Sequence, residues 1–330
     1  MDITNNNQEL ISLIKHVSLS ADGVGDSTAS TIATYFDSLD SFLSATEDDL
    51  RGIKNIKRQP ILRQSQSESL MKAIQKLPRD KGLRETWVSV IVSDFVDSAV
   101  ENLNSIHFDN LMLNPLLVRA LDMRTANQVL EFFLYQSISR SVVTSWGMRV
   151  QDILIHSGAD PIVKGDPGGF DVKKVINNVF NFIQIKSGTN TMNVDMIRYL
   201  NQKVEELESE HPNHKGLLGL TYGRRNQVSG QIMGNLNNPQ ERLKVGEELW
   251  EFISSEKGYF FKVLEIIAEA SHKRLEKSFA DMIQEKFDEI KVEWQKRYGG
   301  FDETSVDQFL SDYLGISKQE VEELGEKAKE

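Results

Sequence analysis

The sequence of 330 residues contains no cysteine. Without thiols, disulfide bonds, thiolate nucleophiles and cysteine-bound zinc are excluded as sources of stability or chemistry. Long apolar runs are also missing, because no window approaches the roughly 18 apolar residues of a membrane span. The opening segment has no basic region followed by an apolar core, MDITNNNQELISLIKH. We therefore expect no membrane span, no secretory signal and a cytoplasmic protein.

Charge is distributed unevenly along the chain. The net charge is −11, which by itself argues against a nucleic-acid partner. Residues 51–84, however, carry ten Lys and Arg against two acids, a local charge of +8. Residues 303–330 carry eight acids against three lysines, a local −5. A DNA contact through this compact basic region is therefore compatible with the net negative charge of the whole chain.

The periodicity of apolar residues changes along the chain and predicts two domains. Residues 1–80 have helical spacing throughout and end at Pro78, which predicts a small all-helical module. Over 81–330 we expect helices at 82–104, 125–143 and 146–156, and turns from 160 to 170. Strands are expected at 172–176 and 179–186, a long helix at 191–211, a strand at 215–223 and helices to the end. This order predicts an α/β domain with heavy helical decoration.

Two glycines in the first module form a turn that leads into a helix N-terminus. Such a turn exposes backbone N–H groups and the positive end of the helix dipole, which suits a phosphate. The spacing of DGVGDSTASTI and of TEDDLRGIKNIK resembles the paired helix-hairpin-helix modules of DNA-binding and repair proteins. Asn55 and Lys57 stand where that family usually has glycines, so charge would replace amides in the second hairpin. The resemblance implies a sequence-independent contact with DNA by Gly23, Val24, Gly25, Ser27, Lys54, Asn55, Lys57 and Arg58.

Other interpretations of these features remain open. The turn at Gly23 and Gly25 could simply connect two helices tightly, using the backbone freedom of glycine. A dinucleotide fingerprint would need a strand before the turn, and the preceding segment has helical spacing instead. The two histidines of HPNH, near residue 212, lack nearby cysteines and are better explained as a surface loop than as a zinc site.

A second set of residues has the spacing of a metal-dependent hydrolase. Asp171 follows the turn DPGGF, and the next expected strand ends in Gln184, Ile185 and Lys186. Gln184 and Lys186 share one face of a strand, while Ile185 points into the core and its carbonyl can face a metal. Metal-assisted phosphodiester cleavage needs an acidic ligand and a cation near the attacked phosphate. Lys186 could instead be a charge that protects a sheet edge from aggregation.

This D-x(12)-Q-x-K arrangement resembles the PD-(D/E)xK nuclease superfamily, which includes most type II restriction endonucleases. The resemblance implies a mixed sheet flanked by helices, Mg²⁺ as cofactor, and catalysis by Asp171, Gln184 and Lys186. Most members have an acid where this chain has Gln184, so a preceding helix would supply the missing charge. Asp152 and Glu131 are the candidates. The implied metal ligands are Asp171, Asp152 and the carbonyl of Ile185.

Residues 111–254 further resemble a group of type II restriction endonucleases that cut palindromes of the GGNCC type, through LNPLL, TSWG, KSGTNTMNVDMIRYLNQ, LLGLTYGRRNQVSG and GEELWEFI. The resemblance implies double-stranded DNA as substrate, a homodimer, and a cognate methyltransferase encoded separately rather than bound as a subunit. It also implies DNA contacts by Thr189, Asn190, Asn193, Arg224, Arg225 and Asn226. Alternatively, YGRRN is a solvated turn.

The sequence thus predicts a Mg²⁺-dependent type II restriction endonuclease that leaves 5′-phosphate ends. It would have a helix-hairpin-helix module and additional C-terminal helices. Gln184 also supports an alternative, a non-catalytic DNA-binding or repair protein with a degenerate nuclease domain. A helix-hairpin-helix glycosylase would need a helical catalytic domain, which the expected strands contradict.

Overall fold

The computed structural model describes residues 3–55, 57–111 and 113–315. The chain forms two compact units, each assembled from two segments. The first unit comprises Met1–Asp94 and Gly147–Lys273, and the second comprises Phe95–Trp146 and Arg274–Glu330. The helical module expected over 1–80 falls within the first unit together with the sheet, so the boundary near residue 80 stays a prediction.

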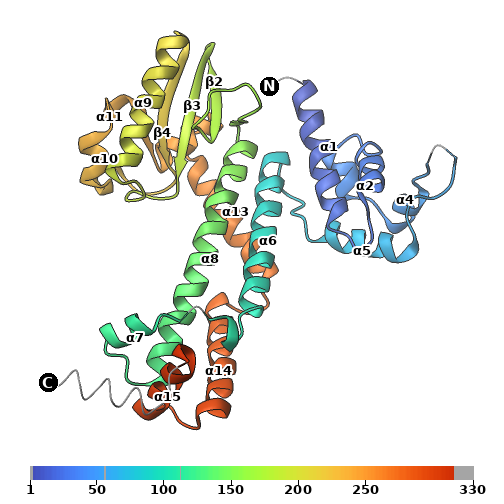
Figure 1. The fold of residues 1–330 in the computed structure, drawn as a ribbon. Helices are drawn as coiled ribbons and strands as arrows, with labels where there is room; N and C mark the ends of the chain where they lie inside the picture. Colours follow the sequence, from blue (N-terminus) through green and yellow to red (C-terminus); the bar gives the residue numbers. More distant parts are fainter. Residues whose placement is uncertain (1–2, 56, 112, 316–330) are drawn as a thin grey trace. The chain divides into compact units, whose positions relative to one another are not determined.

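A mixed five-stranded sheet lies in the first unit, with strand order β1-β2-β3-β4-β5 (Figure 1). The β1–β2 and β2–β3 pairs are antiparallel, whereas the β3–β4 and β4–β5 pairs are parallel. This sheet with its many helices confirms the α/β class. The strands are β1 (Asp160–Pro161), β2 (Val172–Ile176), β3 (Val179–Lys186), β4 (His214–Leu220) and β5 (Leu243–Val245).

The turn between β2 and β3 fixes the register on which the site depends. Asn177 and Asn178 both have positive φ, 50° and 63°, as a two-residue type I′ turn requires. The turn pairs Ile176 with Val179, and the ladder continues to Val172 opposite Ile183. A slip of one residue would move every side chain to the opposite face of the sheet. The turn therefore determines which residues of β3 meet the start of β2.

The predicted amphipathic helix is α9 (Val194–Glu210), which connects the parallel strands β3 and β4. Its buried face includes Ile197, Leu200 and Val204, which pack in one core with Phe182 and Leu218 of the sheet. Figure 1 shows α9 lying along the strands. The close approach depends on Gly216 of β4, where a Cβ atom would stand 2.3 Å from the side chain of Val204. Helix α9 therefore covers one face of β3 and β4 and fixes the position of β3.

Helices account for the N-terminal part of the first unit, as predicted. Ser38 and Thr46 cap two of them in reciprocal capping boxes with Ser41 and Asp49. The helices are α1 (Ile3–Leu19), α2 (Asp26–Ala33), α3 (Leu39–Leu43), α4 (Glu47–Gly52) and α5 (Gln64–Gln75). The predicted helix over 82–104 is confirmed as α6 (Leu83–Asn104).

The two helices predicted over 125–143 and 146–156 are wrong, because one continuous helix α8 (Ala126–His156) spans both. Gly147 lies inside it. An interior glycine costs only about 1 kcal/mol relative to alanine, and no proline breaks the segment. The predicted helical run over 259–298 is interrupted, because Ser278 caps a new helix by accepting a hydrogen bond from the amide of Asp281.

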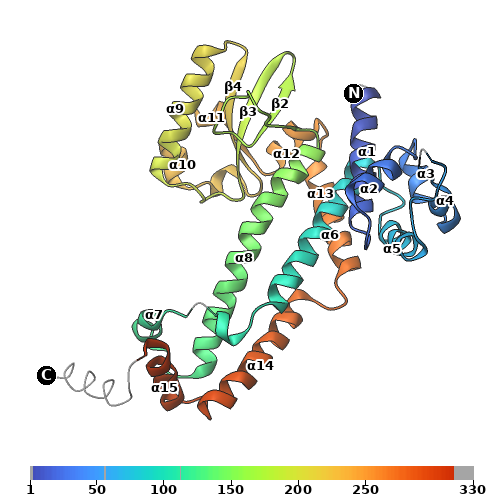
Figure 2. The same ribbon diagram turned by 45° about the vertical axis from the view of Figure 1, so that its right-hand side comes forward.

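A second hydrophobic core organises the second unit. Trp294 is fully buried there with Phe133, Leu134 and Phe309. Figures 1 and 2 both show α7, α14 and α15 gathered around the first half of α8. No helix of the described ranges is long and apolar enough to cross a membrane. The remaining α-helices are α7 (Pro115–Ala120), α10 (Gly230–Asn235), α11 (Pro239–Arg242), α12 (Glu247–Ser254), α13 (Tyr259–Arg274), α14 (Phe279–Tyr298) and α15 (Glu303–Leu314), with 3₁₀ turns η1 (Phe108–Asn110) and η2 (Arg225–Gln227). The acidic tail beyond 315, expected to be helical, lies outside the described residues.

Candidate active site

The β2–β3 hairpin brings Asp171 to the end of β3. The amide of Asp171 donates to the carbonyl of Ile183 at 3.0 Å, which extends the ladder one residue beyond β2. Its carboxylate oxygen Oδ2 accepts a hydrogen bond from the amide of Ile185 at 2.7 Å and another from Nε2 of Gln184. Asp171 and Gln184, predicted from spacing alone, therefore meet directly. The Ile185 side chain is buried, as expected.

Gln184 and Lys186 line a common cavity, and Gln184 also contacts the Asp171 carboxylate. The cavity has a volume of about 310 Å³ and is also lined by Met192, Asp195 and Tyr199. Since Nε2 of Gln184 points to Asp171, its Oε1 is the amide atom left for another partner. Lys186 is half-buried, and its charge acts on Asp171. One carboxylate, one amide oxygen and one ammonium group therefore converge.

Burial dominates the electrostatics of Asp171. Partial burial raises the pKa of this carboxyl above its usual range. The amide of Ile185, the charge of Lys186 and the side-chain amide of Gln151 lower it, but they do not overcome the burial. Because burial disfavours the ionised form of Asp171, a bound cation would stabilise this carboxylate. The oxygen donors of Asp171 and Gln184 fit a hard divalent ion such as Mg²⁺, which retains several water ligands.

Helix α8 contributes Gln151 to the site, which the sequence analysis missed. The sequence pattern instead favours an acid on the preceding helix, Asp152, one residue away from Gln151. Asp152 instead lies 3.7 Å from Arg149 in a half-exposed ion pair. Glu131 belongs to the second unit, where it is exposed and lines a different cavity with Phe132 and Tyr135. The roles of Asp152 and Glu131 as metal ligands stay predictions.

Two loops predicted to face DNA lie together at the same end of the sheet. The amide of Ser229 donates to the carbonyl of Thr189 at 2.9 Å. A Cβ atom on Gly223, which has φ +102°, would stand 2.4 Å from the side chain of Thr189. The loop after β3 therefore packs against the loop after β4. Asn190, Arg224 and Asn226 are exposed on these loops.

A family model for "Type II restriction endonuclease EcoO109I" matches residues 84–275, more than half of the chain. The chain belongs to this family. The matched region includes Gln151, Asp171, Gln184 and Lys186 and both loops, and it supports cleavage of double-stranded DNA. No curated protein matches the chain.

Arg225 of this EcoO109I-family chain is among the residues predicted to contact DNA, and its role there stays a prediction. Its guanidinium pairs with Glu248 at 3.1 Å and donates to the carbonyls of Pro239, Gln240 and Leu243. These contacts tie the loop to α12 and β5, and they would compete with a contact between the Arg225 guanidinium and a base. Asn193 is also engaged, because its Oδ1 caps α9 by accepting from the amide of Met196 at 2.9 Å.

The first N-terminal hairpin has a left-handed glycine followed by a glycine N-cap, and its contact with phosphate stays a prediction. Gly23 has φ +74°, and Gly25 is the N-cap of α2 with no side-chain hydrogen bond there. Val24 is buried while Ser27 is exposed, and the amide of Val24 already donates to the carbonyl of Ala21 at 3.2 Å. Asp26 in the first turn places a negative charge beside these amides, partly balanced by Lys15 at 2.9 Å. This acid weakens attraction for a phosphate.

The second hairpin uses its own side chain to occupy its amides. Oδ1 of Asn55 accepts hydrogen bonds from the amides of Lys57 at 2.9 Å and Gln59 at 3.0 Å. Arg58 takes the left-handed conformation, with φ 60°, that a glycine would otherwise supply. The amides of Lys57 and Gln59 are therefore not free for a phosphate. The exposed side chains of Lys54, Lys57 and Arg58 still carry positive charge.

Proposed function

We propose that this protein is a Mg²⁺-dependent type II restriction endonuclease that hydrolyses both strands of a specific duplex site and leaves 5′-phosphate ends. The observation that carries the proposal is the convergence of Asp171, Gln184 and Lys186 at the end of β3, within the segment that matches the family. Membership of the family does not specify the metal, the ends of the products or the roles of these residues, which are therefore part of the proposal.

Each residue has a distinct task in the proposed reaction. Asp171 holds the cofactor, and Oε1 of Gln184 positions it or a water molecule. Mg²⁺, when bound, polarises the scissile phosphate and makes a bound water more acidic. Lys186 stabilises the negative charge that develops on the phosphate, or orients the attacking water. In-line attack forms the new P–O bond as the bond to the 3′ oxygen breaks, leaving a 3′-hydroxyl and a 5′-phosphate.

The two loops and the basic N-terminal region would hold the duplex. Arg224, Asn190 and Asn226 suit base contacts, since Arg and Asn form paired hydrogen bonds with guanine and adenine edges. The charges of Lys54, Lys57 and Arg58 would add a sequence-independent contact with phosphates. DNA binding is then expected to weaken steeply as salt rises. A palindromic site with one cut per strand matches the two-fold symmetry of a homodimer with one active site for each strand.

Incubation with a long unmethylated DNA, with Mg²⁺ and separately with EDTA, tests this proposal. Discrete fragments that appear only with Mg²⁺, with ligatable 5′-phosphate ends, are expected. Intact DNA that nevertheless shifts on a native gel would contradict it and favour the alternative, a DNA-binding protein whose nuclease site has lost its second acid at Gln184.

A further inference from the structure

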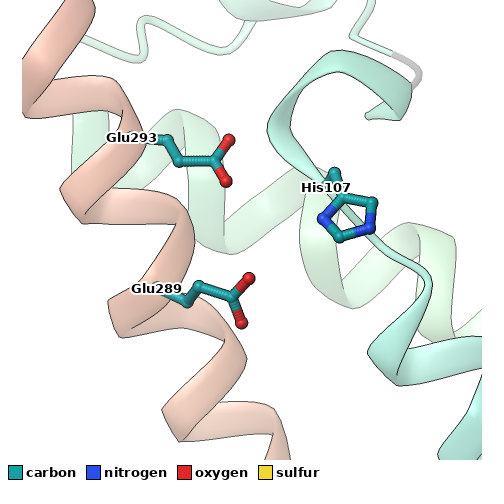
Figure 3. A group of neighbouring side chains, drawn as sticks. All are labelled: His107, Glu289 and Glu293. Carbon is teal, nitrogen blue, oxygen red and sulfur yellow. The ribbon is translucent and has the colours of Figure 1, made fainter.

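Three potential metal ligands meet in the second unit, in residues that the proposed nuclease function does not use. His107 precedes the 3₁₀ turn η1, and Glu289 and Glu293 lie one turn apart on α14. One ligand atom of each residue lies within 4.8 Å of those of the other two. Figure 3 shows both carboxylates pointing from α14 toward the imidazole.

Packed elements hold the backbone that carries these donors, while the side chains of His107 and Glu289 are exposed and that of Glu293 is half-buried. The amide of His107 donates to Oδ1 of Asn110 at 2.8 Å, and the adjacent Phe108 is buried. The Phe108 ring stands edge-on to Trp294 of α14, with ring centroids 5.9 Å apart. Ile290 and Trp294, each one residue after a glutamate, are buried and anchor the neighbouring face of α14. Ligands on packed elements lose little freedom when an ion binds.

The three side chains are close to one another, but His107 forms no hydrogen bond or ion pair with either glutamate in the described part of the chain. An imidazole N–H can donate to a carboxylate, yet within the described residues the ion-pair partner of Glu289 is Lys286 and not His107. Metal–ligand distances of about 2.0–2.2 Å place neighbouring ligand atoms a little beyond 3 Å apart, so rotations of the glutamate side chains would bring the three donors onto one ion.

Neighbouring charges leave the cluster net negative. Lys286 neutralises part of Glu289 at 2.7 Å and donates to the carbonyl of Asn104. Arg297, one turn beyond Glu293, is already paired with Asp109 at 2.5 Å. The two carboxylates therefore retain about one uncompensated negative charge when the imidazole is neutral. A dication would reverse that charge and relieve the repulsion between glutamates spaced i and i+4.

We propose that His107, Glu289 and Glu293 form a second metal site that takes a divalent transition ion such as Mn²⁺ or Zn²⁺. The imidazole selects this class, because Mg²⁺ and Ca²⁺ prefer ligands made only of oxygen. The ion joins the segment before η1 to α14 and so stabilises the second unit. The site is independent of the one at Asp171, whose side-chain ligands include no histidine.

Pulsed EPR of Mn²⁺ bound to full-length Asp171→Ala protein tests the proposal, because removing the proposed catalytic ligand suppresses Mn²⁺ at the other site. Imidazole coordination is expected to appear as nitrogen modulation of the Mn²⁺ signal. The His107→Ala substitution should remove it, whereas His272→Ala, at an exposed histidine of α13, should preserve it. A protein with no nitrogen modulation, or one in which His107→Ala retains it, would overturn the proposal.

Affinity and stability provide a second measurement on the same protein. Glu293→Gln should weaken Mn²⁺ binding at least tenfold in calorimetry, whereas Glu285→Gln on the same helix should not. Saturating Mn²⁺ should raise Tm by a few degrees, and this shift should be absent in the His107→Ala protein. Equal affinity in both glutamate variants would contradict the assignment.

Discussion

Asp171 shares its carboxylate with amide groups rather than with a second acid. Gln184 and the backbone of Ile185 donate to it directly, and Gln151 acts on it from α8. Amides orient a carboxylate but add no negative charge to attract a cation. In the proposed enzyme, the site should therefore bind Mg²⁺ weakly until the DNA phosphate adds its own charge.

Replacing Gln184 by glutamate adds the missing charge in a side chain of nearly the same shape. We expect Gln184→Glu to lower the Mg²⁺ concentration for half-maximal cleavage about tenfold, because each 1.4 kcal/mol of added attraction is a factor of ten. Cleavage rates over a Mg²⁺ titration measure this. Gln295→Glu, on the exposed face of α14, is the matched control. An unchanged or increased Mg²⁺ requirement would argue against Gln184 as a neighbour of the metal.

The raised pKa of Asp171 predicts a pH-dependent cost of stability in the metal-free protein. The folded state holds the proton more tightly than the unfolded state, so stability falls as pH rises through the folded pKa. At pH 8 in EDTA the full cost is present, and Asp171→Asn should raise Tm above that of the wild type. At pH 4 the gain should shrink sharply. A variant that is equally or less stable at pH 8 would disprove that burial dominates.

At the scale of elements, neighbouring arginines of one loop perform different tasks. Arg225 is engaged with Glu248 and three carbonyl groups, whereas Arg224 is exposed. We expect Arg225→Ala to reduce the free energy of unfolding by about 2 kcal/mol, since hydrogen bonds to charged groups are strong. Arg224→Ala should leave stability unchanged and weaken binding of cognate DNA about tenfold. Denaturant unfolding and a gel-shift titration distinguish them, and identical behaviour of the two variants would refute the assignment.

Sequence patterns located most elements, because local chemistry specifies them. The Asn177–Asn178 turn and the alternation in β3 place Asp171 beside Gln184 without further information. The continuity of α8 could not be predicted in the same way, since packing decides whether a glycine ends a helix. Gln151 could not be predicted, because the family pattern calls for an acidic side chain on the preceding helix and Gln151 contributes a neutral amide. The engagement of Arg225 depends on residues 14–23 positions away, beyond any local pattern.

At the scale of the molecule, the exposed apolar side of α8 in the second unit suits the proposed dimer. Phe132 and Tyr135 are 37% and 51% exposed beside a cavity of about 630 Å³ that Leu121 also lines. Helices with apolar residues on an open face are usually covered by a partner.

Light scattering should give a mass of about twice 37.5 kDa for the wild type and close to one chain for Phe132→Asp. Tyr35→Asp, at an exposed tyrosine of the first unit, should remain a dimer. A wild-type monomer, with and without DNA, would contradict the symmetric arrangement.

In the proposed enzyme, Lys186 acts with Asp171 and Gln184 in DNA cleavage, and the cleavage rates of three proteins test this role. Wild-type protein, Lys186→Ala and Lys215→Ala are incubated with unmethylated DNA and Mg²⁺, and cleavage rates are measured. Lys215 is exposed on the adjacent strand β4, so its loss controls for charge. We predict at least a hundredfold loss of cleavage in Lys186→Ala with DNA binding retained, and near wild-type cleavage in Lys215→Ala. Full activity of Lys186→Ala would contradict the proposed active site.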